Sequence, residues 1–219
     1  MSINIKRKVN ILTHLSIHKF IYYNFFSRKI KRNGKGCILP YRRAVLDIAK
    51  GAKIILHDGH FFINYHKPKG SKAEAYVKLL KNANLEILGN TFLNYKSTIE
   101  VHQNARVEIG SAYINSGAVI LAAEKIELGK DELISRDVYI FDSDHHAILN
   151  QDGEKINPAK PVKIEDHVWI GLKSTILRGS EIGEGAVIAA NSVVGGKIKP
   201  GTMASGNPAR SYSEIKWKE

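Results

Sequence analysis

Branched aliphatic residues recur at every sixth position in the C-terminal part of this 219-residue chain, and a second, mostly small residue follows each of them four positions later. An α-helix repeats its apolar face every 3.6 residues and a simple strand every two, so a six-residue period fits neither. It predicts a short strand followed by a sharp corner, with three such sides closing one turn of a triangular coil. The aliphatic residues are Ile164, Ile170, Ile176, Ile182, Ile188 and Val194, and their followers are Val168, Ser174, Ser180, Ala186, Ser192 and Ile198.

Upstream the pattern recurs with slips of phase, so we expect irregular coils or small bulges before residue 126. The predicted fold class is therefore mainly β, a solenoid of parallel coils. The aliphatic residues that carry the pattern there are Ile87, Leu93, Ile99, Val107, Ile109, Leu128, Ile134 and Ile140.

Segments without the repeat divide the chain. Residues 1–35 are predicted to be a basic helical appendage, with one broad apolar face. Residues 36–84 are predicted to start the coil, with a short helix inserted at 72–81. The core is predicted to span residues 85–212, and residues 213–219 form a C-terminal tail.

Residues 141–161, within the core, contain no hexad and must leave the coil as a loop. A long loop inside a regular solenoid is where function is commonly located. We therefore expect the functional site at this loop.

The net charge of +12 is concentrated at the N-terminal end. Residues 1–46 hold eleven Lys or Arg and no acidic residue, whereas the remainder holds 22 basic and 21 acidic residues. No nucleic-acid-binding motif accompanies the excess charge, so no nucleic acid partner is expected.

No apolar run reaches the roughly 18 to 20 residues of a membrane span, and no cleavage site follows the N-terminus, so we expect a cytoplasmic protein. The single cysteine, Cys37, excludes an intramolecular disulfide.

Two interpretations of residues 1–35 stay open. As a basic amphipathic helix, the segment fits peripheral contact with the anionic inner face of a membrane. Alternatively, it caps the prism by covering the open β-edge of the first coil. Its cations gather towards the ends of the segment rather than on one face, which favours the cap.

The hexads, the DSDHH motif at 142–146, VWIG at 168–171 and GNPAR at 206–210 together resemble the hexapeptide-repeat acetyltransferases. Within that family the chain is similar to the maltose, galactoside, xenobiotic and polysaccharide O-acetyltransferase group. The resemblance covers roughly residues 85–212. It implies a left-handed parallel β-helix and a homotrimer with active sites in the clefts between neighbouring subunits. It also implies acetyl-CoA as donor and direct transfer without a covalent acyl-enzyme.

Acetyl transfer to a hydroxyl needs a base, and histidine has a fitting pKa. The loop offers His145 and His146, of which only one is expected to face the cleft, because neighbouring residues of an extended segment point opposite ways. The resemblance favours His146 as the base, with His145 as the alternative. Asp142 and Asp144 either orient the imidazole or cap backbone amides as turn residues. A metal is not expected, because His102, His145, His146 and His167 lack the spacing of the zinc sites known in this fold.

The resemblance also implies where acetyl-CoA is bound. The backbone N–H of Leu172 is the candidate donor to the thioester carbonyl, and Ala190 matches a position whose backbone binds the pantetheine arm. The phosphates require cations and free amides. The matching residues are Gly195, Gly196 and Arg210, with Lys197 or Lys199 as possible compensation, since the family usually has threonine and lysine at the two glycines.

Two residues are candidates for contact with the acceptor. Asn115 matches a family asparagine near the acceptor and the base, although asparagine is also common in β-helix corners. Trp169 is predicted to point outward from its hexad, either into a subunit contact or into the wall of the acceptor or pantetheine channel.

We therefore expect an O-acetyltransferase acting on a sugar or glycan hydroxyl, in a setting such as cell-surface polysaccharide synthesis. The alternatives are N-acetylation of an antibiotic, xenobiotic or amino sugar, and a non-catalytic β-helix scaffold.

Overall fold

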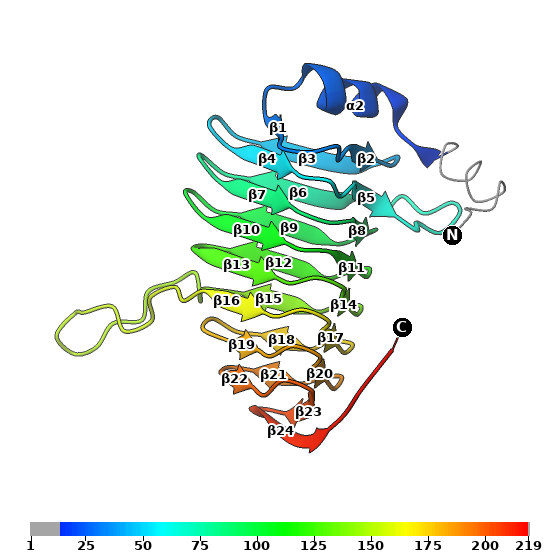
Figure 1. Ribbon diagram of the computed structural model, residues 1–219. Coiled ribbons are helices and arrows are strands. Elements are labelled where there is room, and N and C mark those ends of the chain that lie inside the picture. Colours follow the sequence, from blue (N-terminus) through cyan, green and yellow to red (C-terminus); the bar gives the residue numbers. More distant parts are fainter. Residues whose placement is uncertain (1–13, 219) are drawn as a thin grey trace.

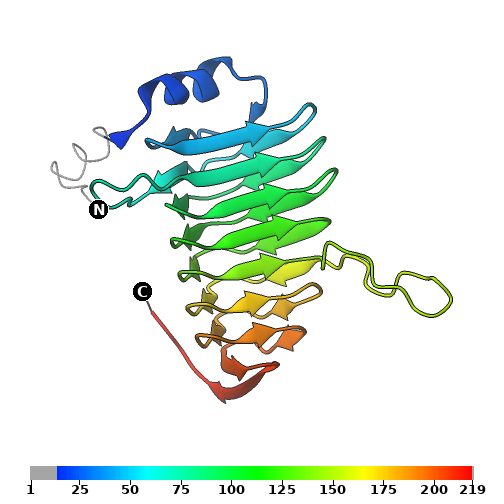
Figure 2. The same ribbon diagram turned by 180° about the vertical axis from the view of Figure 1, so that it is seen from behind.

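The computed structural model of the protein describes residues 14–218. They form a parallel β-helix in which successive strands pass from one sheet to the next and each sheet runs along the whole coil (Figures 1 and 2). The predicted class, mainly β with parallel coils, is confirmed. The first sheet contains β1 (Ile30–Arg32), β4 (Lys53–Leu56), β7 (Asn84–Ile87), β10 (Arg106–Ile109), β13 (Lys125–Leu128), β16 (Val162–Ile164), β19 (Glu181–Ile182) and β22 (Lys197–Ile198).

The other two sheets follow the same order along the chain. The second sheet contains β2 (Ile38–Pro40), β5 (Phe61–Tyr65), β8 (Thr91–Asn94), β11 (Ala112–Ile114), β14 (Glu132–Ile134), β17 (Trp169–Ile170), β20 (Val187–Ile188), β23 (Thr202–Gly206) and β24 (Ala209–Glu214). The third sheet contains β3 (Ala44–Ile48), β6 (Ala75–Leu79), β9 (Thr98–Val101), β12 (Val119–Ala122), β15 (Tyr139–Phe141), β18 (Thr175–Ile176) and β21 (Val193–Val194). Among the strands of residues 14–218, the hairpin of β23 with β24 is the one antiparallel pair.

The hexad aliphatics point into the prism, as predicted. All six, from Ile164 to Val194, are at most 1% exposed. Five of their six strands, β17 to β21, are two residues long, with the hexad aliphatic facing inward in each; β16 is three residues long and buries both Val162 and Ile164. The small residues four positions on are buried beside the corners, and a continuous aliphatic core results.

The upstream coils differ in length from the regular ones. Ile164 lies beside Ile182, whereas Leu85 lies beside Val107 one longer coil away. Upstream strands contain up to five residues and place two aliphatics inward on one side, as in β7, where Leu85 and Ile87 are both buried. The predicted irregularity is therefore real, and its cause is longer strands together with one register shift after Ile63.

Two predicted boundaries were wrong. The segment predicted as a helix at 72–81 contains strand β6, which pairs with β3 on one side and β9 on the other. Ala75, Val77 and Leu79 are buried in alternation with more exposed residues, which is the two-residue period of a strand. The coil also begins earlier than expected, because β1 lies inside the segment predicted to be helical.

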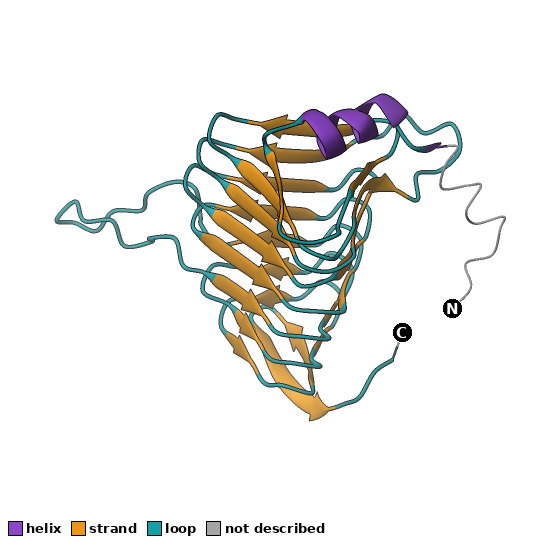
Figure 3. Cartoon of the chain, turned by 45° about the horizontal axis from the view of Figure 1, so that its top comes forward, coloured by secondary structure: helices purple, strands orange, loops and turns teal. Residues whose placement is uncertain are grey.

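The N-terminal helix covers the end of the first coil (Figure 3). The α-helix α2 (Ile17–Ile21) continues into the π-helix η1 (Tyr22–Phe26). Asn24 pairs with the edge of β2, accepting from the Ile38 N–H at 3.0 Å and donating to its carbonyl at 2.7 Å. Lys19 Nζ donates to the carbonyl of Ala44 at 2.6 Å. These contacts are those of a cap over strand edges; residues 1–13 of the predicted helix lie outside the described part.

No helix within residues 14–218 combines the length and the apolar character that a membrane span requires.

Candidate functional site

The long loop leaves the coil at a corner between the third and first sheets. Strand β15 ends at Phe141 and β16 begins at Val162, and the residues between them project away from the prism (Figures 1 and 2). Toward its tip the loop folds back on itself, with a bridge between Leu149 and Lys155. The predicted exit of residues 141–161 is therefore confirmed.

Asp142 anchors the start of this loop. Its carboxylate is fully buried and accepts three backbone N–H groups, from Ala123 at 2.6 Å, Glu124 at 2.8 Å and Lys125 at 2.7 Å. Both oxygens are committed to the preceding coil, because these are the amides that the corner leaves without strand partners. The structure therefore shows Asp142 in the backbone-capping arrangement, one of the two interpretations of this residue.

Asp144 lies in a different environment, on the outside of the same loop. One of its oxygens accepts from Asn157 Nδ2 and from Arg178 Nε, both at 2.9 Å. The hydrogen bond from Asn157, followed by that from Arg178 and its charge, holds the pKa of Asp144 below its usual range. Asp144 is therefore a carboxylate fixed close to both histidines without a hydrogen bond to either ring.

Asn157 clamps the two arms of the loop together. Its side chain is 2% exposed, donates to Asp144 and to the His146 carbonyl at 2.8 Å, and accepts from the Ile148 N–H at 2.6 Å. Sequence reasoning missed both Asn157 and Arg178. The only local signal was that Asn157 precedes a proline, which indicates a turn but not a clamp.

The two adjacent histidines have different surroundings. His145 has a φ of 59°, and its ring lies 5.2 Å from the His102 ring and 6.2 Å from the Phe141 ring. His146 is exposed, its N–H donates to the Asp144 carbonyl at 2.7 Å, and its imidazole makes no hydrogen bond with residues 14–218. One imidazole is thus packed on the third sheet of its own chain, while the other is held only by its backbone.

His102 belongs to a small charged cluster on the third sheet. Its Nε2 lies 3.5 Å from Glu100 Oε1, which also receives Lys78 Nζ at 3.0 Å. His167 is remote from it and stacks on Trp217 with ring centroids 4.0 Å apart. Within residues 14–218, no group of three or more His, Cys, Asp or Glu side chains is arranged to hold a metal ion.

A second set of predicted residues lies at the opposite edge of the third sheet. Asn115, Leu172 and Ala190 occupy corners between the second and third sheets. Asn115 Oδ1 accepts from the Ser116 N–H at 2.8 Å, so its Nδ2 is the polar group left over. The N–H groups of Leu172 and Ala190 donate to no residue in the described part of the chain. A corner that offers free backbone donors suits a carbonyl or amide ligand.

Three of the remaining predicted cofactor residues, Gly195, Gly196 and Lys197, are separated from that corner. Gly195 and Gly196 lie between the third and first sheets; an added Cβ would meet only Leu177 at 3.7 Å in the first case and nothing in the second. Lys197 Nζ pairs with Glu181 at 2.8 Å on the outer side of the first sheet, and both side chains are well exposed. Arg210 is exposed on β24 and pairs in register with Ser205, next to Ala204, whose carbonyl accepts from the Ala189 N–H at 2.8 Å. Arg210 therefore lies near the corner that contains Ala190, whereas Gly195, Gly196 and Lys197 of the same chain do not.

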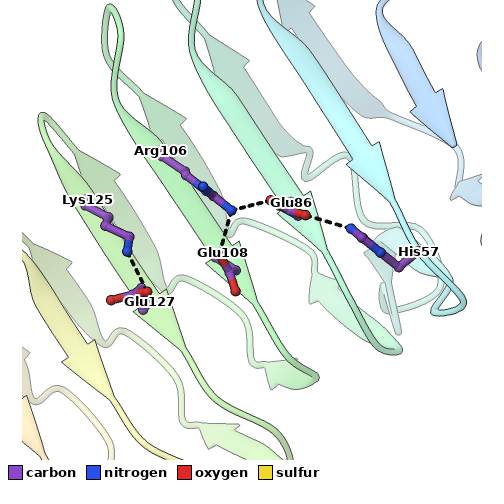
Figure 4. A network of polar contacts seen from close by, with 6 residues as sticks. All are labelled: His57, Glu86, Arg106, Glu108, Lys125 and Glu127. Carbon is purple, nitrogen blue, oxygen red and sulfur yellow. Dashed lines mark hydrogen bonds and ion pairs between the residues drawn. The ribbon is translucent and has the colours of Figure 1, made fainter. Parts of the chain in front are cut away.

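The outer sides of the first and second sheets have opposite chemistry. We name the outer side of the first sheet the charged face; Figure 4 shows Arg106 between Glu86 and Glu108, at 2.5 and 2.8 Å. Its in-register outward residues are Glu86, Glu108, Glu127, Lys163, Glu181 and Lys197. We name the outer side of the second sheet the aromatic face, whose in-register residues are Leu39, Phe62, Phe92, Tyr113, Leu133, Trp169, Val187 and Met203.

Trp169 points outward on the aromatic face, as predicted. Its side chain is 38% exposed, and Nε1 donates to Ser135 Oγ at 3.2 Å. Apolar residues of the loop are also exposed, with Ile148, Leu149 and Ile156 at 53%, 57% and 57%. Such surface is unusual on an isolated solenoid and marks contact regions.

Comparison with known proteins agrees with this geometry. The family model for bacterial transferase hexapeptide (six repeats) matches residues 161–196. A Saccharomyces cerevisiae protein with an acetyltransferase name is 31% identical over 181 residues, which are 82% of this chain and 88% of the relative. The galactoside O-acetyltransferase of Escherichia coli is 28% identical over 70% of this chain and 74% of its own length.

A solved structure supports the fold. A variant of AntD, an N-acyltransferase from Bacillus cereus in complex with dTDP and coenzyme A, has a TM-score of 0.56 and 17% identity, covering 93% of this chain and 91% of that chain. The aliphatic hexads, the three parallel sheets and the relatives all point the same way. The chain belongs to the hexapeptide-repeat acetyltransferases, enzymes built on the left-handed parallel β-helix.

Proposed function

We propose that this acetyltransferase moves the acetyl group of acetyl-CoA to a hydroxyl of a sugar or glycan, with His146 as general base. The observation that carries the proposal is the state of His146. Its backbone is pinned by Asn157 and by the Asp144 carbonyl, yet its imidazole has no partner in the described part of the chain. His145 is the poorer candidate, because its ring already packs against His102 and Phe141.

In the proposed reaction His146 removes the proton of the acceptor hydroxyl as its oxygen attacks the thioester carbon. The carbon–sulfur bond breaks, and the departing thiolate takes the proton from the imidazolium. Asp144, kept ionised by Asn157 and Arg178, favours the imidazolium through its charge. The free N–H of Leu172 would stabilise the negative charge that develops on the thioester oxygen.

We propose that the working site lies between neighbouring subunits of a homotrimer. The histidine loop leaves one edge of the third sheet, whereas Leu172, Ala190 and Asn115 lie at its other edge. A single prism cannot bring the two edges together, but the edge of one prism can face the opposite edge of its neighbour. The exposed apolar residues of the loop and of the aromatic face supply surface for that contact.

Acetyl-CoA is the proposed donor. Leu172 and Ala190 present unbonded N–H groups in successive coils on one corner, which fits the amide-rich pantetheine arm. The phosphates would be received by Gly195 and Gly196, whose corner is open, and by Lys197 and Arg210. Lys197 would first have to leave its exposed pair with Glu181, which costs little.

N-acetylation of an amino sugar or xenobiotic is the second candidate, and the N-acyltransferase neighbour favours it only through the fold. A non-catalytic scaffold is the third. Thiol release from acetyl-CoA, measured with matched panels of neutral sugars, amino sugars and glycans, distinguishes the three. Turnover with hydroxyl acceptors and not with amines supports the proposal; turnover with amines alone replaces it with the second candidate. Absence of turnover with every acceptor, when acetyl-CoA binding is measurable, favours the scaffold.

A further inference from the structure

A cavity lies near the N-terminal end of the prism, far from the coils predicted to bind acetyl-CoA. Its volume is about 710 Å³, within the range of ligand-binding pockets. Two stacked corners between the second and third sheets form it, residues 41–43 after β2 and residues 64–71 at the end of β5 and beyond it, together with His14.

The lining of this cavity is strongly basic. Arg42, Arg43, Lys67 and Lys69 contribute four cations, and no lining residue is acidic. At its rim Arg43 pairs with Glu74 at 3.6 Å, with both side chains about half exposed. Burial, and then the charges of Arg43 and Arg42, hold the pKa of Lys67 below its usual range. The positive charges therefore reinforce one another without an internal counter-charge, which favours an anionic ligand.

The wall also contains polar atoms that lack partners. Tyr41 and Asn64 are both more than nine-tenths buried. The Tyr41 hydroxyl and Asn64 Oδ1 have no hydrogen-bond partner among the described residues. Asn64 is held in place by donating to the Arg42 carbonyl at 2.7 Å. An unpaired donor and an unpaired acceptor cost stability, and both belong to residues that line the cavity.

Aromatic rings lead from this cavity along the prism toward the acceptor candidates. The ring centroid of Tyr65 lies 5.5 Å from that of Tyr41 and 5.2 Å from that of Phe92. The ring centroids of Phe92 and Tyr113 are 6.0 Å apart. His66 Nδ1 lies 2.9 Å from the Tyr113 hydroxyl. Tyr113 belongs to the second coil after that of His66, and it precedes Asn115 by two residues in the sequence. From β5 to Trp169 on β17 the path crosses four strand spacings of about 4.8 Å, roughly the length of a short oligosaccharide.

We infer that this cavity, which we name the basic pocket, binds an oxyanion group of an anionic oligosaccharide, several sugar units away from the unit that is acetylated. Phe62, Phe92 and Tyr113, at the end of the aromatic face away from Trp169, take the apolar sides of the intervening sugar rings. The inference rests on the proposed function in one respect, that the anion is carried by a saccharide acceptor. It adds that the acceptor is long and acidic, and that a region outside the acetyl-transfer site selects it.

The test is direct binding by calorimetry to the full chain without acetyl-CoA. The probes are hyaluronan hexasaccharide, which carries carboxylates, phosphorylated maltohexaose, and maltohexaose as the neutral control. At low salt at least one acidic probe is expected to bind about tenfold or more tightly than maltohexaose, and the advantage should fall at high salt. The acidic probe that binds identifies the anion as carboxylate or phosphate.

Variants connect this binding to the basic pocket. The double variant Arg42→Gln/Lys67→Gln should weaken binding of the acidic probe by about tenfold or more, because each cation contributes a charge-assisted contact. Lys53→Gln, an exposed lysine on the charged face, is the matched control and should bind as the unaltered protein does. Thermal melting of both variants checks that the fold is retained.

Equal affinity for acidic and neutral probes, or unchanged binding by a folded Arg42→Gln/Lys67→Gln variant, overturns the inference. Failure of the proposed function gives a different result. In that case the acidic probe still binds at the basic pocket, but no hydroxyl acceptor supports release of thiol from acetyl-CoA.

Discussion

The charged face and the aromatic face have the same inner surface and opposite outer ones. Behind both, the inward residue of each strand is aliphatic and buried, as Ile182 is on the first sheet and Ile188 on the second. On the outside, the first sheet alternates carboxylates with lysines and an arginine (Figure 4), while the second presents rings and aliphatic chains. The hexad therefore constrains only the residue that points inward. The type of residue at the outward position depends on its surroundings, which are water for the charged face and a partner or ligand for the aromatic face.

The difference also explains where the candidate chemistry lies. The charged face is saturated by its own pairs, for example Lys125 with Glu127 at 2.6 Å and Lys163 with Glu165 at 3.1 Å. The free N–H groups, the unpaired imidazole and the basic pocket all lie at the two edges of the third sheet. The comparison predicts large effects at those edges and small effects on the charged face.

The largest effect is expected for His146→Ala. Loss of a general base costs about 10²- to 10⁴-fold in turnover, while acetyl-CoA affinity and melting temperature should change little because the exposed imidazole makes no hydrogen bond with residues 14–218. Lys163→Ala, on the charged face of the same coil, is the control and should retain full turnover. Steady-state thiol release measures both. If His145→Ala is inactive and His146→Ala is not, the two histidines exchange roles; if neither matters, the mechanism is incorrect.

Glu132 sharpens the comparison because it is a carboxyl inside the prism. Its side chain is 1% exposed with both oxygens unpaired among the described residues, and burial raises its pKa to about 9. Between pH 4.5 and about 9 the unfolded chain has released this proton and the folded chain retains it, so stability falls as the pH rises. At pH 7 the loss is about 3 kcal/mol relative to low pH.

Glu132→Gln should therefore melt at a higher temperature near neutral pH and show a flatter dependence of stability on pH than the unaltered protein. Glu127→Gln changes the same residue type on the charged face and should leave that slope as it was. Denaturant unfolding at several pH values makes the measurement. An unchanged slope in Glu132→Gln would mean that the carboxyl finds a partner in the folded protein.

The proposed subunit contact can be broken on one face and not the other. Trp169→Asp places a charge on the aromatic face and should convert a particle of three times 24.4 kDa into one of 24.4 kDa, because a desolvated charge opposes the contact. Lys163→Asp, in the same coil on the charged face, should leave the assembly intact. Light scattering at micromolar concentration decides. A monomer in the unaltered protein would remove the shared-cleft site altogether.

The smallest effect is expected at the N-terminal cap. The inner side of the cap packs against the first coil. On its outer side, Phe25 and Phe26 are each 72% exposed beside a basic segment. We propose salt-sensitive binding to anionic vesicles, with each surface cation contributing about 1 kcal/mol. Phe25→Ser/Phe26→Ser should weaken sedimentation with such vesicles, and neutral vesicles serve as the control. If the unaltered chain shows no salt-sensitive binding, the segment serves as a cap alone.

The regular coils were predictable because their information is local. A strand of two residues and a corner repeat within six positions, so Ile164 to Val194 identify both the period and the core. Strand β6 was missed for the opposite reason. Its alanine, lysine and leucine residues favour a helix in isolation, and pairing with β3 and β9 overrides that preference.

The candidate site shows the same division. The loop and its histidines follow from a gap in the repeat beside DSDHH, but the clamp does not. Asn157 is 13 positions from Asp144 and Arg178 is 34 positions away, and only the return of the loop to the next coil brings them together. The basic pocket likewise needs two corners from successive coils, which no local pattern connects.

The sequence by itself determined the repeating unit, the buried aliphatic residues and the place where the chain leaves the coil, since each depends on neighbours within about one hexad. Tertiary structure decided which carboxylate is buried under backbone amides, which histidine retains a free ring, and which outer face is charged or apolar. Those properties depend on stacking of one coil on the next, at separations of 16 residues or more that vary along the chain. The length of each coil sets the number of residues between stacked positions, and that length depends on how the complete β-helix folds.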